Sequence, residues 1–378
     1  MKKYAILTTV DASLSAFLLP VAFALQKEGI DITLISSMSE EFYNKYSKIF
    51  TCYNVSMKRG FHLKSLVTTF VTLCKIFRTE KYDVIEYATE NVSFPASIAG
   101  WLFGIPVRIY DHWGARYIGL MGWERRISWI LEKITARCST TIRQVSEKNK
   151  LLCAQDKLYK TSKCVVLGRG GTIGVDFSRF DKFHAEEWRR KIRSELGIPQ
   201  DANVLGFVGR IQTDKGINEL LSAFREIQHE NCYLVLVGPI DSENPIQKEN
   251  MEYAQKNEKI IFTGKLNHVQ EVLCAFDILV HPTYREGFGM ILQEAAAMDI
   301  PIITTDIIGP NEFVNNNETG ILVPPKESQA LLHAINSLLQ DFSKRKQIAE
   351  NAYQYTKKYF DRDIMVSRIV EDRKKLLK

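Results

Sequence analysis

The chain has 378 residues, a length that predicts two domains at roughly 100 to 200 residues each. Hydrophobic residues make up 45% and charged residues 25%, proportions that exclude a disordered, collagen-like or disulfide-scaffold protein. The net charge of +6 is unevenly divided, because residues 1–175 hold 24 Lys and Arg against 14 Asp and Glu, whereas residues 176–378 hold 26 against 30. A basic first half suits nucleic acid, an anionic membrane or an anionic lipid-linked substrate, and charge alone does not choose among them.

The composition predicts neither a membrane span nor a disulfide framework. Spanning a membrane takes about 20 apolar residues, and the longest uncharged window, residues 91–107, is shorter and contains two prolines. Asp11 and Pro20 interrupt the apolar N-terminus before it resembles a signal peptide. The seven cysteines are scattered without a Cys-x-x-Cys pair, so we expect reduced thiols in a cytoplasmic protein.

Short β-branched apolar runs alternate with longer helical patterns along the chain. In the first half, strands are predicted at residues 4–9, 30–35, 83–86, 107–110, 140–143 and 163–167. After a polar stretch at 176–201, strands are predicted at residues 204–208, 233–237, 260–263, 278–281 and 301–304. Such alternation is typical of parallel βαβ units. The sequence therefore predicts an α/β fold with two Rossmann-like domains, at residues 1–178 and 179–356.

The last segment, residues 357–378, has apolar side chains among many charges, which predicts a terminal amphipathic helix. We expect this helix to cross back and pack toward the first domain. Ligands of parallel sheets bind beyond the carboxyl ends of the strands. Two facing Rossmann-like domains would therefore enclose a substrate cleft.

The stretch HPTYREGFGMILQEAAA, residues 281–297, combines glycines with two carboxylates. Its glycines let the backbone approach a ligand closely, and the free N–H groups at a helix start can hold a phosphate. Glu286 in the loop and Glu294 in the helix can accept hydrogen bonds from hydroxyls of one long ligand. Taken alone, the stretch is equally well interpreted as a βα turn with a surface glutamate.

A second motif, GRIQTDKG at residues 209–216, follows the first strand of the second domain. Arg210 and Lys215 would lie beyond the carboxyl end of that strand, where paired cations can neutralise a leaving diphosphate without a metal. Taken alone, two solvated cations are the better interpretation. Asp-Arg-Asp at residues 361–363 imitates a metal motif, but it opens the final helix, where acidic residues favour the dipole. No metal site is predicted.

These strings, together with GPNE at residues 309–312 and NETG at 317–320, resemble the retaining glycosyltransferases of family 4. That family has the GT-B fold and carries two glutamates separated by seven residues, as in YREGFGMILQEAAAMDIP here. The likeness covers most of residues 200–325. Within the family, the chain most resembles bacterial enzymes that extend undecaprenyl-diphosphate-linked sugars for capsule, O-antigen or protein glycans.

The resemblance implies a donor site on the second domain. Glu286 would contact hydroxyls of the donor sugar, and Glu294 would bind the ribose hydroxyls. The backbone of the loop and helix start would meet the sugar and phosphate through Gly287, Phe288, Gly289 and Met290. The diphosphate would be bound by Gly209, Arg210 and Lys215. The residues predicted to be catalytic are His112, Arg210, Lys215 and Glu286.

In the first domain, His112 follows the strand at 107–110, and the resemblance implies that it reaches the donor sugar across the cleft. A lone histidine is more often structural. The predicted acceptor-side residues are Asp11, Ser13, Glu90 and Arg169. The turn after the first strand lacks the glycine pair common in the family. A hydroxyl of Ser13 or Ser15 could compensate, although helix N-capping is the favoured role of Ser13.

The predicted function is retaining, metal-independent transfer of a sugar without a cofactor. The donor is expected to be a nucleotide diphosphate sugar, UDP-hexose or UDP-N-acetylhexosamine, and the acceptor an undecaprenyl-diphosphate-linked saccharide in bacterial surface polysaccharide synthesis. Two alternatives stay open, namely a nucleotide-sugar epimerase or hydrolase of the same fold and a non-catalytic sugar-nucleotide-binding protein.

The basic first half favours an acceptor held at a membrane. Basic-aromatic segments at residues 58–78 and 123–143 suit peripheral contact with the cytoplasmic face of an anionic inner membrane. Core helices with solvated charges explain these segments equally well. No nucleic-acid-reading module is recognised, so nucleic-acid binding is not expected.

Overall fold

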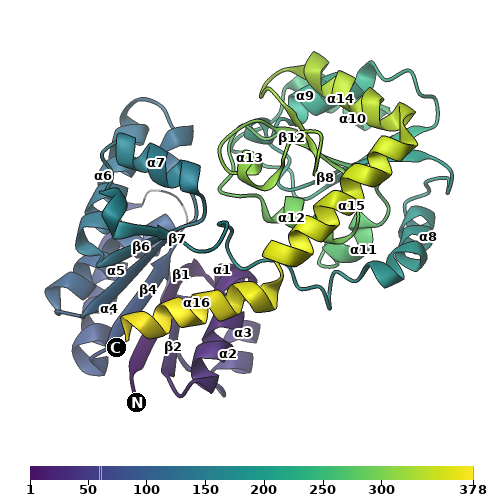
Figure 1. Ribbon diagram of the computed structural model, residues 1–378. Coiled ribbons are helices and arrows are strands. Elements are labelled where there is room, and N and C mark those ends of the chain that lie inside the picture. The colour runs from purple at the N-terminus through teal and green to yellow at the C-terminus, as the bar shows by residue number, and fades with distance from the viewer. Residues whose placement is uncertain (59, 61, 378) are drawn as a thin grey trace. The chain divides into compact units, whose positions relative to one another are not determined.

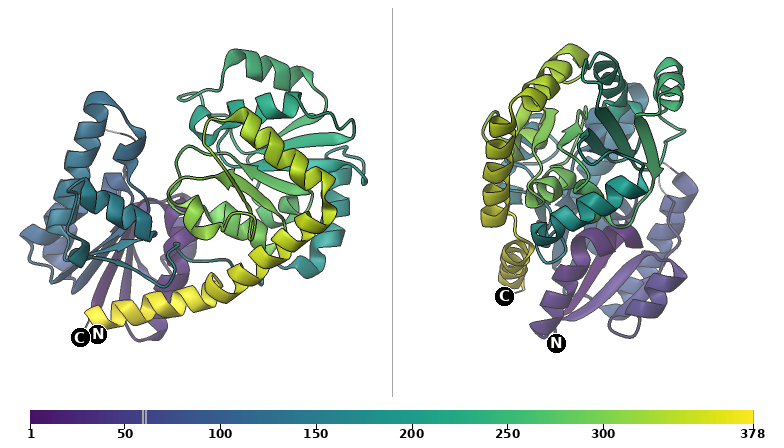
Figure 2. Two further views of the ribbon diagram at one scale, coloured as in Figure 1. Left: turned by 45° about the horizontal axis from the view of Figure 1, so that its top comes forward. Right: turned by 90° about the vertical axis from the view of Figure 1, so that its right-hand side faces the viewer.

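The computed structural model describes residues 1–58, 60 and 62–377. The chain divides into two compact units, Met1–Ile173 with Asp363–Lys378, and Gly174–Arg362. Each unit contains one parallel sheet with helices packed on it (Figure 1). Two further views of the same elements are given in Figure 2.

The first unit has a seven-stranded sheet in the order β3-β2-β1-β4-β5-β6-β7. Its strands are β1 Lys3–Val10, β2 Asp31–Ser37, β3 Thr51–Asn54, β4 Val84–Ala88, β5 Val107–His112, β6 Thr141–Gln144 and β7 Cys164–Val166. Its helices are α1 Asp11–Ser13, α2 Leu19–Lys27, α3 Glu40–Tyr46, α4 Leu63–Glu80, α5 Glu90–Leu102, α6 Gly122–Cys138, α7 Glu147–Gln155 and α16 Arg362–Leu376. A π-helical stretch, Leu14–Leu18, joins α1 to α2.

The second unit has a six-stranded sheet in the order β10-β9-β8-β11-β12-β13. Its strands are β8 Asn203–Val208, β9 Cys232–Val237, β10 Ile260–Gly264, β11 Ile278–His281, β12 Ile302–Thr305 and β13 Ile321–Val323. Its helices are α8 Ala185–Glu195, α9 Ile217–Arg225, α10 Lys248–Lys256, α11 Val269–Leu273, α12 Met290–Ala297, α13 Pro310–Phe313, α14 Ser328–Gln340 and α15 Phe342–Tyr359.

The predicted strands are all present, and two more, β3 and β13, were not predicted. Central strands such as β1 are buried on both faces, which is why they consist of continuous apolar runs. In the first unit, α4, α5 and α6 cover one face of the sheet, while α2, α3 and α16 lie on the other (Figure 1). The prediction of an α/β fold with two Rossmann-like domains is confirmed.

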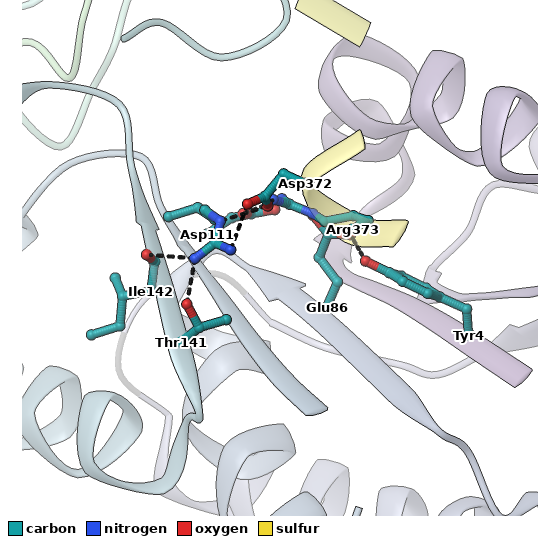
Figure 3. Close-up of polar contacts among 8 residues, drawn as sticks. Tyr4, Glu86, Asp111, Thr141, Ile142, Asp372 and Arg373 are labelled. Carbon is teal, nitrogen blue, oxygen red and sulfur yellow. Dashed lines mark hydrogen bonds and ion pairs between the residues drawn. The ribbon is translucent and has the colours of Figure 1, made fainter. Parts of the chain in front are cut away.

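The predicted return of the C-terminal helix is also confirmed, since α16 belongs to the first unit. The helix starts at Arg362 rather than at the predicted residue 357, and the residues up to Tyr359 belong to α15. Arg373 of α16 reaches the sheet, where its guanidinium binds Glu86 of β4 and, at 3.0 Å, Asp111 of β5 (Figure 3). Asp372 binds Arg143 of β6 through two hydrogen bonds of 2.7 and 2.8 Å.

The charges around Arg373 are nearly balanced. Burial and the neighbouring Glu86 carboxylate raise the pKa of Asp111 well above its usual value, which favours its neutral form. Burial alone would raise the pKa of Glu86, but Arg373 and hydrogen bonds from its neighbours lower it, so Glu86 is ionised. Arg373 is therefore matched by one buried carboxylate on the sheet, whose other oxygen accepts a hydrogen bond from the Tyr4 hydroxyl.

Candidate active site

The donor-side candidates lie at the carboxyl edge of the second unit's sheet. Gly209 and Arg210 follow β8, and Glu286 lies in the loop after β11. Strands β8 and β11 pair in parallel, so both loops leave the same edge. The strand order reverses here, with β9 and β10 on one side of β8 and β12 and β13 beyond β11. In open α/β sheets this reversal forms the crevice where ligands bind.

Lys215 and Glu286 meet at this crevice. The Nζ atom of Lys215 lies 2.7 Å from Oε2 of Glu286, and the two side chains are 17% and 24% exposed. Burial alone would raise the pKa of Glu286, but the Lys215 ammonium and the nearby His281 hold it well below its usual value. The pair therefore places one positive and one negative group within reach of the same ligand.

Two glycines make this contact possible. Gly216 ends the 3-10 turn Thr213–Lys215 with φ +70°, and a Cβ atom there would lie 1.9 Å from the carbonyl oxygen of Pro282. Gly309 has φ +103°, and its Cβ would lie 2.7 Å from the carbonyl oxygen of Glu286. Any larger residue would therefore push apart the turn that carries Lys215 or the loop that carries Glu286.

Arg210 has a different partner. Its Nη1 atom lies 2.9 Å from Oδ2 of Asp241, which follows β9, and the arginine side chain is 58% exposed. The structure thus places Arg210 at the predicted sheet edge but pairs it with Asp241 rather than with Glu286. Sequence reasoning missed Asp241, although its position just after a predicted strand marks it as a residue of the same edge.

Glu294 lies on α12, which begins after Gly289 in the left-handed conformation (φ +92°). Burial raises the pKa of Glu294 to about 7, and Arg179 and Arg362 offset only part of that rise. Its carboxyl group is therefore poised between its acid and base forms near neutral pH. A ligand that donates hydroxyl hydrogen bonds would favour the ionised form.

His281 is a residue of the crevice that sequence reasoning did not assign. It ends β11 beside the predicted loop, stacks on Phe207 with ring centroids 5.5 Å apart, and is 2% exposed. Burial lowers its pKa, so the ring is neutral. Its Nε2 atom lies 3.6 Å from Oε2 of Glu286, and neither ring nitrogen has a hydrogen-bond partner among the described residues.

His112 ends β5 in the first unit and is 1% exposed. Its Nε2 lies 3.0 Å from Oε2 of Glu132, and the Gln144 amide nitrogen lies 3.0 Å from Nδ1. Burial alone would lower the pKa of His112, but hydrogen bonds with Cys153 and Glu132 raise it to about 10. That pKa favours the protonated ring at neutral pH, where the Gln144 amide would turn its oxygen toward Nδ1; in the neutral ring, the amide nitrogen donates to Nδ1 while Oε1 accepts from the Val145 N–H.

In either form of the His112 ring, Nε2 carries a proton that Glu132 accepts. Both ring nitrogens are therefore engaged within the first unit, and the imidazole is held in one orientation. Sequence reasoning missed Glu132 and Gln144, which lie on α6 and β6. Whether the His112 ring meets a donor sugar stays a prediction.

Each of the acceptor-side candidates has its own surroundings in the first unit. Asp11 accepts hydrogen bonds from the N–H (2.7 Å) and hydroxyl (2.6 Å) of Ser39. Glu90 binds Arg116 at 2.5 Å and accepts a hydrogen bond of 2.7 Å from the Ser128 hydroxyl. Arg169 is exposed in a glycine-rich turn after β7.

The expectation that Ser13 caps a helix is wrong. Helix α1 already begins at Asp11, and Ser13 is its last residue, with no capping hydrogen bond from its side chain. The strand order of this sheet reverses between β1 and β4. At that point, the Thr9 N–H donates a hydrogen bond of 2.9 Å to the Thr89 hydroxyl.

Two features are absent from residues 1–58, 60 and 62–377. No group of three or more His, Cys, Asp or Glu side chains is arranged to hold a metal ion. No helix in that part of the chain is long and apolar enough to cross a membrane.

Two families match the chain. "Glycosyl transferases group 1" matches residues 189–355, and "Glycosyl transferase 4-like" matches residues 5–145. A capsular polysaccharide biosynthesis glycosyltransferase of Staphylococcus aureus, CapM, is 30% identical over 95% of this chain and 93% of its own length. The chain therefore belongs to the group 1, family-4-like glycosyltransferases, as its motifs predicted, and is a glycosyltransferase.

More distant relatives act on lipid-linked saccharides. The UDP-Gal:α-D-GlcNAc-diphosphoundecaprenol α-1,3-galactosyltransferase of Escherichia coli is 23% identical over 84% of this chain and 82% of its own. Among solved structures, Anabaena HepE in complex with UDP-glucose aligns with a TM-score of 0.82 at 18% identity, covering 99% of this chain and 100% of that one. The structural likeness identifies the fold as that of the GT-B glycosyltransferases.

Proposed function

We propose that this glycosyltransferase moves a hexose or N-acetylhexosamine from a UDP-sugar to a polyprenyl-diphosphate-linked saccharide of a bacterial surface polysaccharide. Transfer would keep the anomeric configuration and use neither a metal ion nor a cofactor. The contact between Lys215 and Glu286 at the sheet edge where the strand order reverses supports this proposal most directly. The names of the Escherichia coli relative and of the HepE complex support UDP as the nucleotide.

The two charges have separate tasks in the proposed reaction. The bond between the anomeric carbon and the donor diphosphate breaks while the acceptor hydroxyl oxygen bonds to that carbon from the same face. The proton of that hydroxyl passes to an oxygen of the departing diphosphate, so UDP leaves with it. Lys215 and Arg210 stabilise the negative charge of the leaving group, which is the task a metal ion performs elsewhere. Glu286 accepts hydrogen bonds from sugar hydroxyls and fixes the sugar's orientation.

The acceptor is proposed to lie on the first unit at the cytoplasmic face of the membrane. Residues 1–175 carry an excess of ten cations over acidic side chains, which suits an anionic lipid surface. Asp11, Glu90 and Arg169 are the side chains proposed to contact the acceptor, and His112 the residue proposed to face the donor sugar.

Incubation with UDP-sugars and a diphosphoundecaprenol-linked GlcNAc acceptor tests the proposal. We expect a glycosylated lipid whose new bond has the donor's anomeric configuration by NMR, in the presence of EDTA as well as in its absence. A donor-only incubation is the control, because an epimerase or hydrolase changes the nucleotide sugar without any acceptor. Inverted product, EDTA-sensitive transfer or donor conversion without acceptor would each contradict the corresponding part of the proposal.

A further inference from the structure

An apolar groove lies on the face of the first unit that α4, α5 and α6 cover. Helix α5 packs between α4 and α6 (Figure 1). Side chains of these three helices line an open groove of about 500 Å³. All of its lining side chains are apolar: Leu63, Leu66, Val67, Phe70, Phe94, Pro95, Ile98, Ile127, Ile130 and Leu131. An extended peptide could not pair its backbone N–H and C=O groups on such a lining, whereas a hydrocarbon chain has no polar groups to pair, so the groove suits a hydrocarbon chain.

The groove is exposed although it is apolar. Leu63, Val67 and Ile130 are 66%, 55% and 47% exposed. At the end of α5, Trp101 and Leu102 are also exposed, at 59% and 56%. A monomeric soluble protein rarely leaves apolar side chains together on its surface unless something covers them.

A polar pocket continues the groove. This second hollow, of about 260 Å³, shares Leu66, Ile127 and Leu131 with the groove and is also lined by Glu90, Arg116, Glu124 and Ser128. Arg116 is 42% exposed while bound to Glu90, so its guanidinium can reach a second anionic group. The combined site is apolar at one end, and at the other it carries the Arg116 guanidinium and the Ser128 hydroxyl beside the carboxylates of Glu90 and Glu124.

The direction of the site fits the direction of the sheet. Glu90 is the first residue of α5, directly after β4, and therefore lies near the carboxyl edge of the sheet. Helix α5 then runs back from that edge over 13 residues, about 20 Å at 1.5 Å per residue. The polar pocket thus lies near the edge where ligands of such sheets bind, and the groove leads away from it.

We propose that the groove holds the hydrocarbon chain of the lipid-linked acceptor, with the polar head of that lipid at Arg116 and Glu90. This inference rests on the proposed function, which supplies a substrate with one long apolar chain and one anionic, hydroxylated head. The charge of the surrounding helices agrees with an anionic lipid. Helix α4 carries three cationic side chains and one acidic one, and α6 carries four and two.

Binding of farnesyl diphosphate to the full-length chain, measured by titration calorimetry, tests the groove without requiring turnover. This probe has an isoprenoid chain and a diphosphate, and inorganic pyrophosphate is its chain-free counterpart. We expect farnesyl diphosphate to bind at least about tenfold more tightly than pyrophosphate, because the apolar chain leaves water. Equal affinity for the two would overturn the proposal.

Val67→Asp and Ile130→Asp place a charge in the groove at positions exposed enough for the fold to tolerate it. Each is expected to weaken farnesyl diphosphate binding about tenfold or more, because the charge must be desolvated beside the chain. The matched control is Leu151→Asp on α7, which is 53% exposed and outside the groove. Unchanged binding in both groove variants, or the same loss in the control, would overturn the proposal.

Anionic phospholipid vesicles separate a chain-binding groove from a plain membrane contact. If the groove variants lose vesicle binding but keep farnesyl diphosphate binding, the groove contacts the bilayer surface and the assignment to the acceptor chain is wrong. Sugar transfer is measured in the same preparations. If the protein transfers sugar but binds farnesyl diphosphate and pyrophosphate equally, the groove assignment is wrong and the proposed function stands. If binding depends on the groove but no sugar is transferred, the proposed function is wrong and the groove assignment stands.

Discussion

Lys215 and Glu286 neutralise each other in the chain without a donor, with their charged atoms 2.7 Å apart. In the proposed donor complex, a nucleotide sugar would take over both contacts, with its diphosphate at Lys215 and its hydroxyls at Glu286. Charge-assisted hydrogen bonds then replace an ion pair that was only partly shielded from water. Both groups are already in place, so little reorganisation is needed when the leaving group develops its charge.

Lys215→Met is expected to lower the turnover rate about 100-fold or more, because one preorganised charge facing the leaving diphosphate is lost. Lys215→Arg keeps the charge and should retain more activity than the methionine variant. The measurement is the initial rate of sugar transfer at saturating donor. Lys248→Ala, at a side chain that is 91% exposed in the same unit, is the control and should not change the rate. Full activity in Lys215→Met would remove this residue from the mechanism.

The raised pKa of Glu294 predicts how donor binding depends on pH. Its pKa in the folded chain is about 7, above the ordinary value of 4.5, so the folded state binds this proton more tightly than the unfolded state does. Its contribution to the free energy of unfolding therefore falls as the pH rises from 4.5 through 7. A donor whose ribose hydroxyls bond to the carboxylate favours the ionised form, so the dissociation constant of UDP should decrease between pH 6 and pH 8.

Calorimetric titration of UDP across this pH range checks the prediction. Glu294→Gln keeps the size of the side chain and removes its ionisation, so its UDP affinity should lose this pH dependence. The same slope in both proteins would show that another group is responsible.

Individual residues differ in how far the sequence predicts them. Lys215 and Glu286 come from motifs of fixed spacing, and the structure brings them together. The partners of His112 could not be predicted, because Glu132 and Gln144 lie 20 and 32 residues away on other elements. Which side chain meets which across a sheet or between a helix and a strand depends on packing that local patterns do not encode.

At the scale of elements, helix α12 carries a buried polar group that its own unit does not satisfy. Gln293 is fully buried, and neither its amide nitrogen nor its oxygen has a partner among the described residues. Gln293→Leu is therefore expected to raise the free energy of unfolding by about 1–3 kcal/mol, the cost of burying an unpaired polar group. Urea unfolding measures it, with the exposed Gln340→Leu as a control that should change little. A less stable Gln293→Leu would reveal a partner for the amide, such as a buried water.

The strands show which elements a sequence predicts well. Strand β1 is buried on both faces and is an unbroken apolar run, so its position is evident. Strand β3 is at the edge of its sheet with every residue at least partly exposed, and β13 has only three residues. Polar residues interrupt β3, and two prolines end the apolar run of β13 after three residues, whereas the equally short β7 continues into Leu167. The division between α15 and α16 was missed for a different reason, since charged residues at helical spacing continue through both.

At the scale of the whole molecule, α16 joins the last residues of the chain to the first sheet. Arg373 lies 287 positions from Glu86 and 262 from Asp111, and its side chain is 3% exposed. The amphipathic pattern of the last segment predicts a helix and a surface for it to pack on. The pattern does not predict that a buried arginine of this helix pairs with carboxyl groups of the sheet. In the sequence, Glu86 and Asp111 are single acidic residues within otherwise apolar strands, and nothing near them indicates a partner.

Arg373→Met is expected to lower the free energy of unfolding by about 3–5 kcal/mol, because the Glu86 carboxylate stays buried without its cation. The adjacent Lys374→Met is the matched control. Lys374 is 47% exposed in its ion pair with Glu28, so its loss should cost less than about 1 kcal/mol. Urea unfolding of both variants measures the difference. If the two variants lose equal stability, the buried network does not hold α16 to the sheet.

The second unit is one continuous segment of the chain, whereas the first unit consists of two segments. The second unit can therefore be expressed alone as a single fragment. Residues 174–362 contain an entire sheet, its own core cluster and every donor-side candidate from Gly209 to Glu294. We expect this fragment to unfold cooperatively and to bind UDP within about tenfold of the full-length chain, as measured by calorimetry. Residues 1–173 alone should fold poorly, because Glu86 and Asp111 lose Arg373 and the sheet loses the buried face of α16. If the fragment 174–362 folds but does not bind UDP, residues of the first unit are needed to hold the nucleotide, and the donor site cannot be assigned to the second unit alone.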